Sequence, residues 1–265
     1  MIVGVDYRNK RVLVTGASSG IGAALAEEFA KRAAVVGICA RRKDRLDDVL
    51  KRCAIHSPQS RAWVTDLSDP SQVDHLAEMA TEELGQIDIL VNNAGIPKRR
   101  HISVIDMSTV ESVMQVNFMA AARLTLALLP GMIERDEGHV VNISSVAATL
   151  SSPKEAVYVA SKAALSTFSE SMAVDLWDSG VKVLVVYPGV VPTELYGVPG
   201  NDPVLPGVSP IGVDEVVTAT FDALETGKRQ VYVPSYFSEI AAQKAADVDG
   251  FLKGTAAYVA EASRA

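Results

Sequence analysis

The chain has 265 residues, of which 48% are hydrophobic and 22% charged, and its formal net charge is −7. This composition is typical of a folded domain with a sizeable core and excludes a disordered chain. An acidic chain also lacks the basic face that nucleic-acid binding needs. We interpret the short run Lys98-Arg99-Arg100-His101 as a solvated loop in preference to the alternative, a rim near a functional site.

The cysteines, histidines and N-terminus carry no sign of metal binding or export. Cys39 and Cys53 are isolated and form no CxxC pattern, which predicts buried thiols in a reducing compartment. The four histidines lack metal-ligand spacing, so we expect no metal site. The first ten residues contain no apolar signal-peptide core, and we find no uninterrupted apolar stretch of about 18 residues, so we expect a cytoplasmic protein with no membrane insertion.

Seven short apolar runs alternate with helical patterns along the chain. Such runs are typical of strands buried on both faces, and their alternation with helices predicts a mostly parallel sheet between two helical layers. Right-handed crossovers make this a doubly wound α/β fold. The predicted strands are residues 11–14, 34–40, 61–65, 88–91, 139–143, 181–187 and 230–233.

The segments between these runs show helical periodicity. One helix begins at Ser68-Asp69-Pro70, with proline in the first turn, and another ends near Gly227, where glycine suits a helix C-terminus. A third is expected to end near Ser179-Gly180. The predicted helices are residues 21–32, 43–53, 70–84, 108–115, 118–134, 155–178 and 214–224.

Two segments fall outside this alternation. Residues 188–213 are rich in proline and glycine, and a loop of this length inside a compact domain is typical of an active-site lid. Residues 234–265 are alanine-rich and predict a C-terminal extension of one or two helices that packs on the body or on a partner subunit.

The first strand leads into a glycine-rich turn, Thr15–Gly22, with glycines at 16, 20 and 22. A tight turn needs residues that tolerate unusual backbone angles, and a pyrophosphate needs close approach to the N–H groups of a helix N-terminus. The position of the turn at the first strand–helix junction favours dinucleotide binding over an ordinary turn.

The end of the second strand indicates which dinucleotide binds. An acidic residue is expected there for the ribose of NAD, but the sequence reads Cys39-Ala40-Arg41-Arg42. Two guanidinium groups suit a 2′-phosphate, so we predict that NADP(H) is preferred over NAD(H). The alternative is that Arg41 and Arg42 only begin a charged helix.

Tyr158 and Lys162 stand four positions apart in a predicted helix and so share one face. A nearby lysine cation favours the phenolate and lowers the pKa of a tyrosine, which makes it a usable acid or base. Tyrosine and lysine at this spacing are also common by chance, so the pair gains its meaning from its surroundings.

In those surroundings the sequence resembles a short-chain dehydrogenase/reductase of the single-domain type with about 250 residues. The resemblance covers residues 11–233 and implies one Rossmann-fold domain over residues 1–265. The matching elements occur in the family's order and are Thr15–Gly22, Asp66-Leu67, Asn92-Asn93-Ala94-Gly95, Asn117, Ser144-Ser145, Tyr158 with Lys162, and Pro188-Gly189 with Thr193.

The resemblance implies four catalytic residues. Tyr158 would protonate a carbonyl oxygen in reduction or deprotonate an alcohol in oxidation. Lys162 would lower the pKa of Tyr158 and bind the nicotinamide ribose, and Ser145, with Ser144 as a rival, would hold the substrate oxygen. Asn117 would support a water that relays protons to Lys162.

The resemblance also implies a cofactor site. Asp66 would bind the adenine amino group, and Thr193 with its neighbours would hold the nicotinamide carboxamide. The cofactor-binding residues expected are Gly16, Ser18, Ser19, Gly20, Ile21, Gly22, Arg41, Arg42, Asp66, Leu67, Asn93, Ala94, Gly95, Tyr158, Lys162, Pro188, Gly189, Val191 and Thr193.

The substrate walls are expected from residues 96–102, 146–152 and 190–206. Their apolar members predict a hydrophobic ketone or secondary alcohol, although the same side chains could simply pack the lid. These candidates are Leu150, Val190, Leu195, Tyr196, Val198 and Leu205.

Two further functions fit the same scaffold. One is a catalytically silent NADP(H)-sensing protein, which retention of Ser145, Tyr158 and Lys162 argues against. The other is an epimerase or dehydratase, for which the sequence offers no additional acid or base. The resemblance also implies a homodimer or homotetramer, paired through residues 118–134 and 155–178.

Overall fold

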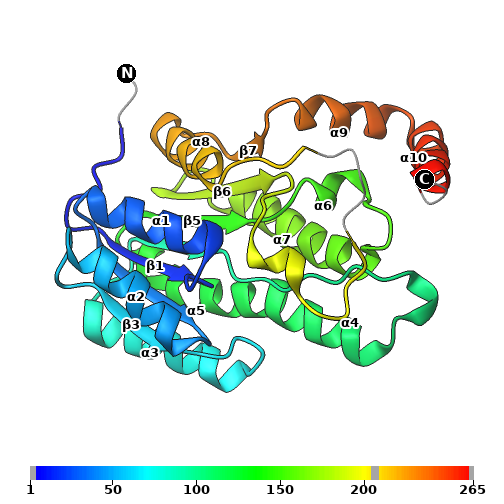
Figure 1. The fold of residues 1–265 in the computed structure, drawn as a ribbon. Helices are drawn as coiled ribbons and strands as arrows, with labels where there is room; N and C mark the ends of the chain where they lie inside the picture. The colour runs from blue at the N-terminus through cyan, green and yellow to red at the C-terminus, as the bar shows by residue number, and fades with distance from the viewer. Residues whose placement is uncertain (1–3, 204–208, 263–265) are drawn as a thin grey trace.

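A seven-stranded parallel sheet forms the centre of the molecule (Figure 1). The computed structural model describes residues 4–203 and 209–262, except for the side chains of Leu195 and Tyr196. The strand order is β3-β2-β1-β4-β5-β6-β7, which confirms the doubly wound fold. The strands are β1 Arg11–Thr15, β2 Val35–Ala40, β3 Arg61–Val64, β4 Ile89–Asn92, β5 Gly138–Ile143, β6 Val181–Pro188 and β7 Gln230–Val233.

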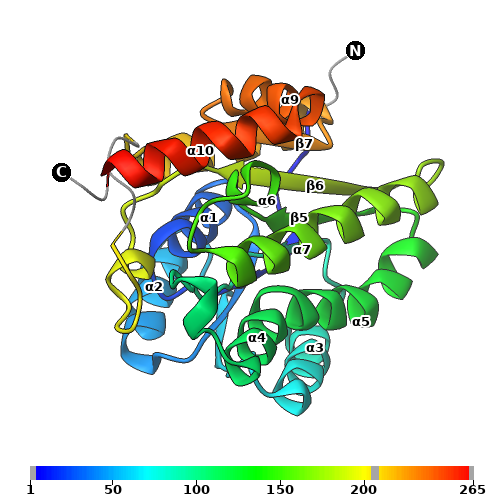
Figure 2. The same cartoon turned by 90° about the vertical axis from the view of Figure 1, so that its right-hand side faces the viewer.

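Helices cover both faces of the sheet, because each face presents apolar side chains that must be buried. Phe29 of α1 and Phe221 of α8 lie in one core, whereas Leu76 of α3, Leu124 of α5 and Met172 of α7 lie in the other. Figure 2 shows α3, α4, α5 and α7 gathered on this second face. The helices are α1 Gly20–Lys31, α2 Lys43–Ala54, α3 Pro70–Leu84, α4 Met107–Met114, α5 Ala120–Glu134, α7 Ala156–Asp175 and α8 Val213–Thr226.

The two helices predicted between β4 and β5 are one continuous helix. A π-helical turn, Gln115–Met119, joins α4 to α5, and it contains Asn117. The helical periodicity of the sequence does not reveal this π-turn, because a π-turn keeps a helical pattern while adding one residue to the turn. Such turns occur often at functional sites. The helix α7 likewise ends at Asp175, short of the predicted Ser179-Gly180.

The combined helix Met107–Glu134 is long and apolar enough to cross a membrane, with a mean hydropathy of 1.5 over its best 18-residue window. The sequence showed no uninterrupted apolar stretch of that length, and the helix reaches this value as an average over mixed residues. A core helix meets the same criteria. Leu124, Leu128 and Met132 are buried in the second core, as expected of such a helix.

Several short elements lie around the sheet's carboxyl edge. The lid contains one helical turn, η3 Glu194–Gly197, and α6 Ala147–Leu150 follows β5. A third short turn, η1 Ile102–Val104, precedes α4. The sequence predicted none of these three, since turns of three or four residues carry too little periodicity.

The C-terminal extension forms two helices, α9 Phe237–Ala246 and α10 Val248–Ala262. Lys244 Nζ of α9 donates to Thr149 O of α6 at 2.7 Å and to Ser151 Oγ at 2.7 Å. Figure 1 shows α10 at the outer edge of the molecule beyond α9. The extension therefore packs on the body through α9.

The strand order reverses between β1 and β4, which are neighbours in the sheet. Ligands of open α/β sheets bind in the crevice outside the carboxyl ends of the strands at such a switch point. The loops after β1, β4, β5 and β6 therefore meet there, and they carry most of the residues that the sequence singles out.

Candidate active site

The glycine-rich turn is hydrogen-bonded to the residues that follow β4. Thr15 Oγ1 accepts from the backbone N–H groups of Asn93 at 3.0 Å and Ala94 at 3.1 Å. Asn93 Nδ2 donates to the carbonyl oxygens of Thr15 at 2.9 Å and Gly16 at 3.2 Å. Asn93 thus fixes the backbone of the turn, as the sequence predicts for a residue that supports the pocket.

Gly16 is a position in this turn that leaves no room for a side chain. Its φ is +65°, and a Cβ there would lie 2.7 Å from the Cα of Ala94. Left-handed backbone angles favour glycine, and the neighbouring atom is backbone that cannot rotate away. The close approach of the two loops therefore depends on glycine at this position.

We expect Gly16→Ala to lower the free energy of unfolding by more than the roughly 1 kcal/mol that a strained backbone angle alone costs. Gly227→Ala is the matched control, since Gly227 has φ +67° and no atom within 4 Å of a built Cβ. Urea denaturation of both variants measures the difference. Equal losses would mean that the contact with Ala94 relaxes freely.

The two arginines after β2 lie at the same edge. Arg42 Nη2 donates to the hydroxyls of Ser18 and Ser19 in the glycine-rich turn, both at 2.9 Å. Its Nη1 lies 2.5 Å from the carboxylate of Glu194 on the lid, which also pairs with Arg45. Arg41 lines the same cavity and is exposed.

Asp66 lies between two residues of the cavity wall but is not part of the wall itself. Its carboxylate accepts from Ser68 N at 3.0 Å and Ser68 Oγ at 2.8 Å, which holds the pKa of Asp66 below its usual range, and Arg41 adds to the effect. Asp66 does not line the cavity, whereas its neighbours Thr65 and Leu67 do. Its predicted bond to an adenine amino group therefore stays a prediction.

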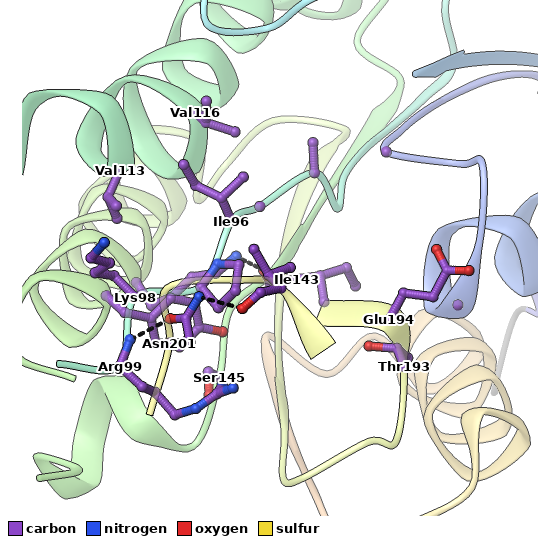
Figure 3. Close-up of a pocket in the computed structure, with 18 of the residues that line it drawn as sticks. Ile96, Lys98, Arg99, Val113, Val116, Ile143, Ser145, Thr193, Glu194 and Asn201 are labelled. Atoms are coloured by element: carbon purple, nitrogen blue, oxygen red, sulfur yellow. Dashed lines mark hydrogen bonds between the residues drawn. The ribbon is translucent and has the colours of Figure 1, made fainter. Parts of the chain in front are cut away.

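Lys162 is almost fully buried beneath the cavity. Its Nζ donates to Ile143 O at the end of β5, 2.8 Å away (Figure 3), and its side chain is only 3% exposed. Burial lowers the pKa of Lys162 to about 8. Because this value is still above neutral pH, Lys162 remains mostly a cation there and can favour a phenolate at Tyr158 on the same helix face.

The two serines after β5 have different surroundings. Ser144 is buried, and its hydroxyl lies 2.8 Å from Ser166 Oγ and 3.1 Å from Lys162 O, both on α7. Ser145 Oγ accepts only from Ala147 N among the described contacts, at 3.1 Å, and remains a half-buried part of the cavity wall. This favours Ser145 over Ser144 as the predicted contact for a substrate oxygen.

Asn117 connects three segments in the π-turn. Its Oδ1 accepts from Ile96 N at 2.8 Å, and its Nδ2 donates to Ile96 O at 3.0 Å and to Ser161 Oγ at 2.9 Å. Ser161 in turn donates to Tyr158 O at 2.7 Å. Asn117 is buried and does not line the cavity, so its side chain positions the loop and α7. Sequence reasoning missed Ser161, although its place between Tyr158 and Lys162 was a signal.

These segments enclose one cavity of about 830 Å³. It takes in every cofactor-binding residue predicted from the sequence except Gly22 and Asp66, together with Ser145. Residues from the loops after β1, β2, β4, β5 and β6 thus meet in one space, as the carboxyl edge of a parallel sheet predicts.

The substrate end of the cavity differs in part from the prediction. Val146, Val190 and Val198 line it, whereas Leu150 at the end of α6 does not. Leu205 and the side chains of Leu195 and Tyr196 lie outside the described residues. Sequence reasoning missed the wall formed by Ser108, Thr109, Ser112, Val113 and Val116 of the helix around α4.

The basic run 98–101 is not simply a solvated loop. Lys98 and Arg99 line the cavity, and Arg99 is only 5% exposed. Arg99 N donates to Asn201 Oδ1 at 2.6 Å and its Nε donates to Asp202 O at 3.0 Å, so the lid covers it. Four consecutive polar residues carry no periodicity from which this burial could be predicted.

The fold and this cavity define a Rossmann-type protein with a dinucleotide-sized site at its switch point. The described residues fit such a ligand, since Gly16, Ser18, Ser19 and Gly20 of the turn line the cavity and the guanidinium of Arg42 donates to both serine hydroxyls. A family model described as short chain dehydrogenase matches residues 10–200. The chain therefore belongs to the short-chain dehydrogenase/reductase family, whose members are oxidoreductases acting between CH–OH and C=O groups.

Individual proteins of this family are similar to the chain in sequence and structure. The Fatty acyl-CoA reductase Rv0547c of Mycobacterium tuberculosis is 41% identical over 201 residues, covering 72% of this chain and 68% of that protein. A short-chain dehydrogenase from Sphingobium yanoikuyae in complex with NADPH is 32% identical, with a TM-score of 0.80 over 94% of this chain and 95% of that one. A family member from Burkholderia phymatum in complex with NAD has a TM-score of 0.83 at 24% identity, covering 92% and 96%. These neighbours support a nicotinamide cofactor.

Proposed function

We propose that this chain is an NADP(H)-dependent oxidoreductase that interconverts a carbonyl and an alcohol on a hydrophobic substrate, with Tyr158 as the acid/base. The observation that carries the proposal is the cavity itself, whose wall includes Ser145, Tyr158 and Lys162 as well as the glycine-rich turn. A substrate oxygen at Tyr158 and a dinucleotide on the turn would thus share one space.

The chain's own residues manage the proton. In reduction Tyr158 donates its hydroxyl proton to the carbonyl oxygen, while Ser145 donates a hydrogen bond to the same oxygen and holds it in place. Lys162, fixed by Ile143 O, stabilises the phenolate that remains. When bound, the nicotinamide supplies or accepts the hydride. In oxidation the same proton moves in the opposite direction.

The preference for NADP(H) rests on Arg41 and Arg42. The guanidinium of Arg42 already donates to Ser18 and Ser19 in the turn where phosphates are expected. No carboxylate stands at the end of β2 to repel a 2′-phosphate, since the strand ends in Cys39-Ala40 and Arg41 follows. Glu194 opposes this preference, because it partly neutralises Arg42. The NADPH complex of the Sphingobium protein is consistent with the proposal, and the NAD complex of the Burkholderia protein shows that the fold accommodates either cofactor.

The substrate class follows from the apolar wall. The apolar side chains that line the cavity include Ile96, Val113, Val116, Val190 and Val198. The similar mycobacterial protein is named a fatty acyl-CoA reductase, which agrees with an acyl chain on this wall. The proposal includes an isologous dimer, because Leu126 and Ile133 of α5 and Val174 of α7 are exposed, as is Trp177 in the turn after α7.

Titration of the protein with NADPH and NADH, read by nicotinamide fluorescence, tests the cofactor part of the proposal. We expect NADPH to bind at least about tenfold more tightly than NADH, which corresponds to a difference of about 1.4 kcal/mol in binding free energy. A screen of long-chain aldehydes, ketones and acyl thioesters with the preferred cofactor then tests turnover. Tighter binding of NADH would reject the NADP(H) preference, and binding of neither cofactor would reject the oxidoreductase itself.

A further inference from the structure

The end of the cavity beneath the lid is positively charged, although the chain as a whole is acidic. Among the described residues, its charged wall residues there are Lys98, Arg99 and Lys154, with Glu155 as the one carboxylate beside them. Figure 3 shows Lys98 and Arg99 with Val113 on one side of the cavity, and Thr193 and Glu194 on the other. The positive end is thus separate from Glu194 and from Arg42, which Glu194 binds.

Two of these three cations already have partners. Arg99 Nη1 lies 3.8 Å from Glu155 Oε1, and its Nε donates to the carbonyl oxygen of Asp202. Lys154 Nζ lies 3.6 Å from the Asp202 carboxylate, which Arg100 also approaches at 3.6 Å. These contacts hold the lid to the loops beneath it, and they use the nearby carboxylates.

Lys98 differs from Arg99 and Lys154 in its contacts. It is half-buried on the cavity wall and makes no hydrogen bond or ion pair with any residue in the described ranges. Its charge is felt by Asp106, where it helps lower the pKa, but Asp106 is exposed and its carboxylate already accepts from Thr109 N and Ser108 Oγ. Since no residue in the described ranges pairs with it directly, the Lys98 ammonium depends on water in the cavity for its solvation.

A ligand that fills the cavity would remove that water. Removing water from an ammonium group is unfavourable unless an opposite charge or strong acceptor replaces it. A purely apolar ligand against Val113 and Val116 would bear this cost, whereas a ligand with an anionic group at Lys98 would not. An anion there would also lie near the buried guanidinium of Arg99, the residue that follows Lys98 in the chain.

We propose that the substrate of this cavity is an amphiphile whose anionic group, a carboxylate or a phosphate, binds Lys98 while its apolar part lies against Val113 and Val116. This inference rests on the proposed function in one respect, which is that the substrate binds in the same cavity. It adds a charged end to a substrate whose apolar part the cavity wall already indicates.

Binding of decanoate, decyl phosphate and decanol to the protein tests this without turnover. Each is titrated by calorimetry in the presence of whichever nicotinamide dinucleotide binds more tightly, so that the cofactor arginines are occupied. We expect at least one anion to bind about tenfold or more tightly than decanol, as for a charge-assisted hydrogen bond. A preference for decanoate indicates a carboxylate substrate, one for decyl phosphate a phosphate substrate, and equal binding an anion site open to both.

Lys98→Gln should abolish the preference for anions and leave decanol binding unchanged, and Lys98→Arg should retain the preference. Lys228→Gln is the matched control, because Lys228 is exposed next to the start of β7, at the opposite edge of the sheet. Wild-type protein that binds decanol as tightly as both anions would overturn the inference, as would an anion preference that survives Lys98→Gln. Failure of turnover with intact anion preference would reject the proposed function alone.

Discussion

Tyr158→Phe should remove nearly all turnover while leaving the fold and cofactor binding intact. The substitution deletes only the hydroxyl that donates or accepts the proton, and general acid–base catalysis contributes about 10²- to 10⁴-fold to a rate. Lys162 keeps its bond to Ile143 O, and Asn117 and Ser161 hold the α7 backbone through contacts that do not use the tyrosine hydroxyl. The measurement is kcat on the best carbonyl substrate, with the cofactor Kd measured beside it.

Tyr232→Phe provides the matched control. Tyr232 of β7 stacks on Tyr187 with ring centroids 4.5 Å apart and does not line the cavity. We expect it to lose little activity, because the ring contact survives removal of the hydroxyl. If Tyr158→Phe retained activity similar to that of Tyr232→Phe, then another group would have to transfer the proton. A loss of cofactor binding in Tyr158→Phe would instead indicate a structural role for the hydroxyl.

The sequence predicts the sheet well because buried parallel strands are encoded locally. All seven strands lie within one or two residues of the predicted runs, since each is a short apolar stretch between turn residues. The glycine-rich turn and the Tyr158–Lys162 pair are equally local, as their spacing follows from a turn and from one helical repeat. Topology then brings these segments to one edge of the sheet without further information.

The rest of the site depends on contacts between distant segments. The wall formed by Val113 and Val116 arises because a π-turn joins α4 to α5, and periodicity does not reveal such a turn. The burial of Arg99 arises because Asn201 and Asp202 of the lid bind it across about a hundred positions of chain. Contacts of this kind depend on the backbone conformation of the lid, and that conformation cannot be predicted from hydrophobic periodicity.

Arg42→Ala should weaken NADPH binding by about 10- to 100-fold and leave NADH binding almost unchanged. A guanidinium–phosphate contact is a charge-assisted hydrogen bond worth about 1.5–3 kcal/mol, and NADH lacks the 2′-phosphate. Arg41→Ala should act in the same direction, because Arg41 also lines the cavity. Fluorescence titration of both cofactors against each variant gives the ratio of Kd values. The NADPH loss should shrink at high salt, since ions screen exposed charges.

Substitutions of Arg45 and Glu194 test whether Arg42 contacts the 2′-phosphate or acts only through its charge. Arg45 pairs with the same carboxylate as Arg42 but does not line the cavity, so Arg45→Ala should alter NADPH affinity far less. Glu194→Gln should strengthen NADPH binding, because it removes the carboxylate that competes with a 2′-phosphate for Arg42. Equal losses of NADPH and NADH in Arg42→Ala would show that Arg42 serves only to hold Ser18 and Ser19, and the chain's preference for NADP(H) would then need another source.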